Sequence, residues 1–126
     1  MAATSTFRFT RSNRLLDAAA FGRVFKTATR SRDQQFTVLC RANKLGGARL
    51  GLAVSKKHCR LATDRNRLKR IIRESFRQQQ SALQGLDFVV MNRPRAERHT
   101  NAELFESLDN HWQRCVAKES GREKQE

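Results

Sequence analysis

A run of basic residues between Arg65 and Arg77 is the part of this sequence best suited to binding another molecule. It carries six positive side chains and a single acid, Glu74. Like charges four residues apart destabilise an α-helix by roughly 0.2–0.5 kcal/mol per pair, and three such pairs occur: Arg65–Lys69, Lys69–Arg73 and Arg73–Arg77. Guanidinium groups bind phosphate oxygens through paired hydrogen bonds. The run therefore predicts a polyanion-binding surface, because a merely solvated helix face normally mixes both signs of charge.

The same run has the periodicity of an amphipathic helix, which we predict from Asp64, as its cap, to about Gln80. At 100° per residue one side is apolar and must pack on a sheet; it comprises Leu68, Ile71, Ile72 and Phe76. Polar and basic side chains fall within an arc of roughly 100° on another side; they are Asn66, Lys69, Arg70, Arg73 and Arg77. Arg65 borders both groups, and Arg67 lies outside the arc.

Composition favours a nucleic acid as the partner. The 126 residues form a single domain, for which we predict an ordered core of about residues 9–117, and they carry a net charge of +14. An anionic membrane is the weaker alternative, because no apolar run approaches the ~20 residues of a membrane span. The N-terminus lacks the apolar stretch of a secretory signal. Three cysteines, Cys40, Cys59 and Cys115, indicate reduced thiols and a cytoplasmic protein.

The remaining elements predict an α+β domain with helices against one mixed sheet. A short helix is expected over Asp17–Lys26, followed by a polar connection over Thr27–Asp33. Alternating residues predict strands over Gln34–Asn43 and Ala48–Ser55, and a Gly-Gly turn between them suggests an antiparallel hairpin. A short apolar strand follows at Asp87–Asn92. The last helix opens with a capping box at Thr100–Glu103, and its apolar stripe is Leu104, Phe105, Leu108, Trp112, Cys115 and Val116.

No catalytic residue and no metal site are predicted in the protein itself. His58, His99 and His111 are scattered over different elements, whereas acid–base cleavage of RNA needs a paired base and acid. The acids gather in the last helix and tail, away from the basic surface. The pairs His58–Cys59 and His111–Cys115 supply too few ligands for a structural zinc.

The basic run resembles the "RNR" signature of the bacterial ribonuclease P protein family. The matching residues are Arg65-Asn66-Arg67, Lys69-Arg70 and Arg73-Glu74-Ser75-Phe76-Arg77. Leu50 to Lys57 resembles the strand and basic loop that precede the signature there, and Phe21 to Lys26 resembles the family's first helix. The resemblance runs in order from about Phe9 to Trp112.

This resemblance implies a small α/β sandwich of about four strands and three helices, with a left-handed βαβ crossover. It also implies a subunit that assists a catalytic RNA in removing the 5′ leader of precursor tRNA, with Mg²⁺ in the holoenzyme held mainly by RNA. The residues implied to bind the catalytic RNA are Lys56, Lys57, Arg60, Arg65, Asn66, Arg67, Lys69, Arg70, Arg73 and Arg77. Those implied to bind the leader are Phe21, Phe25 and Leu39, although an aromatic pair at this spacing more often packs inward.

Two other functions remain open on the residues alone. A ribosomal or other structural RNA-binding protein would suit the basic helix equally well, but it has no need of an open cleft at Phe21 and Phe25. An autonomous metal-dependent nuclease is disfavoured, because the basic face lacks clustered carboxylates.

Overall fold

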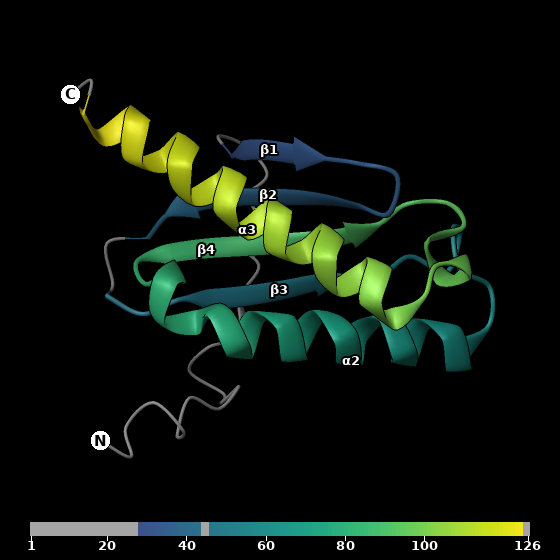
Figure 1. Cartoon of the computed structure of the whole chain (residues 1–126). Coiled ribbons are helices and arrows are strands. Elements are labelled where there is room, and N and C mark those ends of the chain that lie inside the picture. The colour runs from purple at the N-terminus through teal and green to yellow at the C-terminus, as the bar shows by residue number, and fades with distance from the viewer. Residues whose placement is uncertain (1–27, 44–45, 125–126) are drawn as a thin grey trace, which may run out of the picture.

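The computed structural model describes residues 28–43 and 46–124 of the chain. The predicted helix over Asp17–Lys26, with Phe21 and Phe25, lies outside the described residues. A four-stranded sheet has the order β1-β2-β4-β3. Its strands are β1 (Thr29–Arg32), β2 (Phe36–Ala42), β3 (Arg49–Ala53) and β4 (Leu86–Asn92). Two α-helices, α2 (Ala62–Gln79) and α3 (Asn101–Lys124), cover one face of this sheet (Figure 1).

The predicted hairpin between the second and third strands is wrong. β4 lies between β2 and β3; it is antiparallel to β2 and parallel to β3. β4 takes the central position because Phe88, Val89 and Val90 are all fully buried, so the strand is apolar on both faces. The Gly46-Gly47 segment therefore connects strands that are not neighbours.

The connection from β3 through α2 to β4 is a left-handed crossover. Seen from the helix side in Figure 1, both strands run to the right and β4 lies above β3, so the chain passes over α2 in the left-handed sense. Parallel connections are right-handed in about 98% of cases. The fold predicted from the resemblance is thus confirmed in its rarest feature, while the described residues contain two α-helices rather than three, with short 3₁₀ turns η3 (Gln80–Leu83) and η4 (Ala96–Arg98).

The main core fills the space between the sheet and the two helices. Trp112 of α3 meets Phe76 of α2 and Phe88 of β4 edge to face, with ring centroids 6.0 and 5.0 Å apart. The predicted apolar side of α2, Leu68, Ile71, Ile72 and Phe76, is buried in this core. Leu39 and Val89 form a second cluster on the other face of the sheet.

Two boundaries differ from the prediction. Thr27–Asp33, expected to be a connection, contains strand β1, whose short polar sequence shows no hydrophobic alternation. Its partners are on α3: the Thr29 hydroxyl donates to the Glu119 carboxylate, and Ser31 contacts His111. α3 continues to Lys124, beyond its predicted apolar stripe, which ends at Val116. The capping box is confirmed, since Thr100 and Glu103 exchange side-chain and backbone hydrogen bonds of 2.8 and 3.1 Å.

Helix α2 begins two residues before its predicted cap. Leu61 occupies the cap position without a side-chain hydrogen bond, and Asp64 lies in the first turn. A carboxylate there still stabilises the helix, because the first turn carries the positive end of the helix dipole.

Candidate RNA interface

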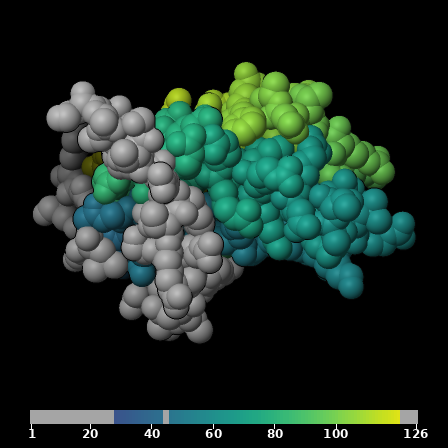
Figure 2. All heavy atoms as spheres, turned by 90° about the horizontal axis from the view of Figure 1, so that it is seen from below, coloured from purple at the N-terminus to yellow at the C-terminus, as the bar shows by residue number. Residues whose placement is uncertain are grey.

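The basic face of α2 is open to solvent. Asn66 and Arg70 are exposed, and Lys69 and Arg73 are partly exposed, while the apolar side of the same helix is buried. In the part of the chain that the structure describes, Lys69, Arg70 and Arg73 form no ion pair. Three uncompensated cations on adjacent turns of one helix are therefore available to an external polyanion. Figure 2 looks onto this side of the molecule, where α2 forms the central teal surface.

Arg77, at the end of this face, is paired within its own helix. Its guanidinium donates to both carboxylate oxygens of Glu74, at 2.9 and 2.6 Å. These hydrogen bonds lower the pKa of Glu74 below its ordinary value. Both side chains are more than a third exposed, so solvent screens the pair. Arg77 is the predicted RNA-binding cation that another charge of the chain already neutralises.

The loop between β3 and α2, Ser55–Leu61, is held by the fold and displays its cations. We call it the basic loop. The Asn92 amide of β4 bonds both backbone groups of Ser55, and the Cys59 side chain is buried. Arg65 then donates from Nη1 to the carbonyl oxygens of Cys59 and Arg60, at 3.0 and 2.7 Å. Lys56, Lys57 and Arg60 remain exposed on this fixed loop.

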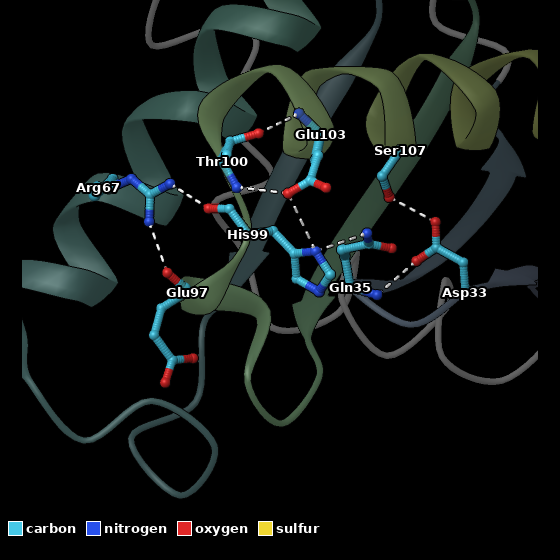
Figure 3. Close-up of polar contacts among 8 residues, drawn as sticks. All are labelled: Asp33, Gln35, Arg67, Glu97, His99, Thr100, Glu103 and Ser107. Carbon is cyan, nitrogen blue, oxygen red and sulfur yellow. Dashed lines mark hydrogen bonds and ion pairs between the residues drawn. The ribbon is translucent and has the colours of Figure 1, made fainter.

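Arg67, the second arginine of the Arg65-Asn66-Arg67 segment, is engaged inside the protein. Its guanidinium donates three hydrogen bonds to the segment that leads into α3. Figure 3 shows two of them, to Glu97 and His99. The acceptors are the carbonyl oxygens of Glu97 and His99, at 2.9 and 2.6 Å, and Oδ1 of Asn101 at 2.9 Å. Arg67 therefore ties the middle of the predicted RNA-binding run to the start of α3.

The segment that Arg67 holds, Arg93–His99, contributes two exposed cations that the sequence prediction missed. We call this segment the β4–α3 corner. Arg95 and Arg98 are exposed, and Ala96 between them is fully buried. The signal in the sequence was a cluster of three arginines around the chain's one proline, Pro94. At the right-hand end of Figure 2 the green atoms of this part of the chain lie beside the teal ones.

Of the three predicted leader-binding residues, the structure describes Leu39. It lies on the sheet face away from the helices, as predicted from strand alternation, and is 3% exposed. Phe21 and Phe25 lie outside the described residues.

A serine–histidine–aspartate contact exists, but it is buried rather than catalytic. Ser31 Oγ lies 2.7 Å from His111 Nδ1, and Asp33 Oδ2 lies 3.1 Å from His111 Nε2. We assign the ring proton to Nε2, since Nδ1 then accepts from Ser31. His111 has no exposed surface and Ser31 only 3%, so no substrate reaches either group. Among the described residues no three His, Cys, Asp or Glu side chains gather as metal ligands, and all three cysteines are buried free thiols.

This network makes the stability of the fold depend on pH. Burial lowers the pKa of His111, an effect that Asp33 offsets only in part and that the nearby Arg114 reinforces. The pKa of a histidine in an unfolded chain is ~6.5. Below that pH the unfolded chain binds a proton at His111 more readily than the folded chain does, which favours unfolding. We expect the melting temperature to fall as the pH is lowered from 7 to 5, and a His111→Gln variant to show a flatter profile. Equal slopes for both proteins would contradict this role.

Asp33 does not share that pH window. Burial would raise its pKa, but hydrogen bonds from the Ser107 hydroxyl and from two backbone N–H groups outweigh that effect, and the pKa lies below its ordinary value. Its contribution to stability is therefore lost only in more acidic solution.

Comparison with known proteins agrees with the basic helix and the left-handed crossover. The sequence model of the family described as Ribonuclease P matches residues 9–116. The chain belongs to the ribonuclease P family. Family members that resemble it include the Ribonuclease P protein component of Nitrosococcus oceani, 45% identical over 106 residues, which are 84% of this chain and 89% of the relative. That of Methylococcus capsulatus is 48% identical over 106 residues, covering 84% and 83%.

Solved ribonuclease P proteins share the fold. That of Staphylococcus aureus matches with a TM-score of 0.72 and 34% identity, over 78% of this chain and 90% of the other. The ribonuclease P protein of Thermotoga maritima gives 0.67 and 35%, over 75% and 89%. The predicted function is thereby confirmed: the family is the protein subunit of the RNA-based endoribonuclease that processes tRNA 5′ ends, and its partner is the ribonuclease P RNA. Within the described residues, no helix has the length and apolar character of a membrane span.

Proposed function

We propose that the basic face of α2, with the basic loop before it, is the surface of this chain that docks on the catalytic RNA. The observation that carries the proposal is a row of three cations, Lys69, Arg70 and Arg73, which are exposed or partly exposed and which no acid of the described chain neutralises. Lys56, Lys57 and Arg60 extend this row at the amino-terminal end of the helix. Contacts of this kind neutralise phosphates and release counterions, which gives affinity without base specificity.

Within this surface the residues have two roles. Asn66 is exposed and suits hydrogen bonds to a sugar, a phosphate or a base edge. Arg65 and Arg67 hold the basic loop and the β4–α3 corner in place, so their part in RNA binding is mainly to position other cations. Arg77, already paired with Glu74, is a peripheral contact.

We further propose that Phe21, Phe25 and Leu39 contact the single-stranded 5′ leader of precursor tRNA. The support is the resemblance of Phe21 to Lys26 to the family's first helix, together with the chemistry of aromatic rings. Unstacked bases stack on such rings whatever their sequence, and leaders of different precursors differ in sequence. Leu39 has little exposed surface, so it would support this contact rather than dominate it.

The protein's share in the reaction, on this proposal, is electrostatic. It screens the repulsion between two RNAs and positions the leader, whereas the catalytic RNA supplies the active site. The holoenzyme would act in the cytoplasm. Mg²⁺ would be held mainly by RNA phosphates, since this ion is commonly bound through phosphate oxygens. The full chain alone is then inactive.

Reconstitution tests this function directly. The purified chain should raise the rate of cleavage of precursor tRNA at the mature 5′ end when it is added to bacterial ribonuclease P RNA at low Mg²⁺. The RNA alone should recover activity at high Mg²⁺, because added cations replace the protein's screening of phosphates. Cleavage by the protein without RNA would overturn the mechanism, and a protein that bound the RNA without affecting cleavage would be a scaffold instead.

The leader contact makes a separate prediction. Phe21→Ala should weaken binding of leader-bearing precursor by ~1–3 kcal/mol, the value of one base–aromatic stack, and should leave binding of mature tRNA to the same holoenzyme unchanged. Affinities for the two substrates, measured side by side, decide the matter. Equal losses for both would place Phe21 in the core.

A further inference from the structure

A hollow of about 370 Å³ opens at the amino-terminal end of α2, between the basic loop and the β4–α3 corner. Each wall contributes two cations, Lys57 and Arg60 from the loop and Arg95 and Arg98 from the corner. Its size lies within the range of sites that hold small molecules. Because the four cations outnumber the two acids that also line it, Asp64 and Glu97, the hollow favours a ligand with an anionic group.

The same hollow contains an apolar surface that the fold leaves uncovered. Leu61 lines it and is 56% exposed, and among the described residues it is the one large apolar side chain with this exposure. Elsewhere in the described chain such side chains are buried or partly buried. An apolar side chain beside cations offers a base or a ribose ring a contact face next to its phosphate.

Glu97 supplies an unused hydrogen-bond acceptor. Its Oε1 atom is buried and has no partner, although buried polar atoms are nearly always hydrogen-bonded. In Figure 3 the Glu97 side chain points away from Arg67, whose contact is with the Glu97 carbonyl oxygen. A carboxylate oxygen accepts hydrogen bonds from hydroxyl and amino groups, which a nucleotide has and a bare phosphate lacks.

Arg95 stands where the backbone would prefer another residue. It has a φ of 69°, and it is the one non-glycine residue of the described chain in the left-handed region. Glycine or asparagine adopts this conformation at lower cost. An arginine at such a strained position points to a function of its side chain that outweighs the local cost.

We propose that this hollow binds one nucleotide of the catalytic RNA that is turned out of its helix. Its phosphate meets the four cations, its base or ribose lies on Leu61, and a hydroxyl or amino group donates to Glu97. Arg67 is a positioning residue for this site, because its three hydrogen bonds hold the corner that carries Arg95 and Arg98. The inference rests on the proposed docking of α2 on the RNA and extends that interface to the corner.

The test compares three pairs of substitutions in the full chain, with the affinity for ribonuclease P RNA measured over a range of salt concentrations. The site pair is Arg95→Gly with Arg98→Gln. The reference pair is Arg70→Gln with Arg73→Gln on α2. The control pair is Arg32→Gln with Arg114→Gln, two exposed cations on β1 and α3. All three remove the same charge.

The site pair should weaken binding about fivefold near 0.15 M salt and reduce the salt slope by about 0.7–0.9, the value for the one phosphate that the hollow holds. Its melting temperature should not fall, because glycine relieves the strained φ of Arg95. Leu61→Ala should weaken binding about fivefold with an unchanged slope, since it removes apolar contact and no charge.

Two results overturn the inference in distinguishable ways. If the site pair binds like the control pair while the reference pair loses slope, the hollow is not part of the interface and the proposed docking of α2 stands. If neither the site pair nor the reference pair alters the slope, the docking proposal fails as well.

The positioning role of Arg67 has its own readout. Arg67→Lys keeps the charge but loses the three-bond geometry, so it should reduce the salt slope even though no charge is removed. In a chain that already carries Arg67→Lys, the site pair should cause little further loss of RNA affinity or of salt slope. Full additivity of the two changes would show that Arg67 does not act through the corner.

Discussion

Replacing Lys69, Arg70 and Arg73 together with glutamine is expected to weaken binding to the catalytic RNA about a hundredfold near 0.15 M salt. The three cations are unpaired on the exposed side of α2. Each phosphate contact contributes about 0.7–0.9 to the slope of log affinity against log salt, so three contacts contribute about 2.1–2.7. At about 1 M salt such contacts no longer contribute to affinity. Between that concentration and 0.15 M, a slope of this size changes the affinity by about two orders of magnitude.

The variant should fold at least as well as the parent chain. Lys69 and Arg73 stand four residues apart, and removing like charges at this spacing relieves repulsion within the helix. The apolar side of α2 is untouched. A melting temperature equal to or above that of the parent would exclude unfolding as the reason for weak binding.

A charge-matched control separates local contacts from total charge. Substituting glutamine for Arg32, Arg114 and Lys118, which are exposed on β1 and α3, lowers the net charge by the same amount. If both triple variants lost affinity equally, RNA would be sensing the overall charge of +14 rather than the face of α2.

Asp87→Ala is expected to destabilise the fold by about 3 kcal/mol, because it leaves the positive charge of Arg49 without its carboxylate partner. Asp87 is 4% exposed and accepts from Nε and Nη2 of Arg49 at 2.8 and 2.6 Å. Asn43 donates to the same carboxylate at 2.8 Å. The loss lies at the lower end of the range for buried pairs because the Arg49 side chain retains 17% exposure. Denaturant unfolding measures it.

The comparison for this prediction is the exposed pair of Glu74 and Arg77. Both pairs bring an arginine and a carboxylate within 2.6 Å, but only the Arg49–Asp87 pair lies inside the fold. Arg77→Ala should therefore change stability little. An Asp87→Ala variant as stable as Arg77→Ala would show that the Arg49–Asp87 contact does not hold β3 beside β4.

Local patterns predicted the elements of this fold well. The period of Leu68, Ile71, Ile72 and Phe76 identified the buried side of α2, and the capping box identified the start of α3. Both features depend on residues within a few positions of each other. Strand β1 was missed because the side chains of Thr29 and Ser31 find their partners on α3, about 80 to 90 positions away.

Strand pairing was the part that the residues alone could not determine. A Gly-Gly turn between two alternating strands favours a hairpin locally, but β4 pairs with both strands and buries Phe88, Val89 and Val90 completely. The left-handed crossover came from the family resemblance, since general rules favour the opposite hand.

The sequence predicted which face of α2 is positively charged, but not which of its arginines are bonded inside the protein. Helical geometry placed Lys69, Arg70 and Arg73 on one exposed face, as found. The internal bonds of Arg65 and Arg67 were unpredictable, because their acceptors are mostly backbone carbonyl oxygens, which every residue has. Nothing local in a sequence marks one carbonyl as the partner of a distant guanidinium.

The parallel alignment of β3 and β4 has a geometric consequence for this chain. Strands that run in the same direction deliver the segments after their carboxyl ends to one edge of the sheet, which is why Ser55–Leu61 and Arg93–His99 emerge side by side. Had the two strands run in opposite directions, those segments would stand apart by a strand length, about 17 Å for five residues. The exposed positions of either segment can therefore change in composition, and so alter what is recognised there, while the hydrogen bonds between the two strands stay the same.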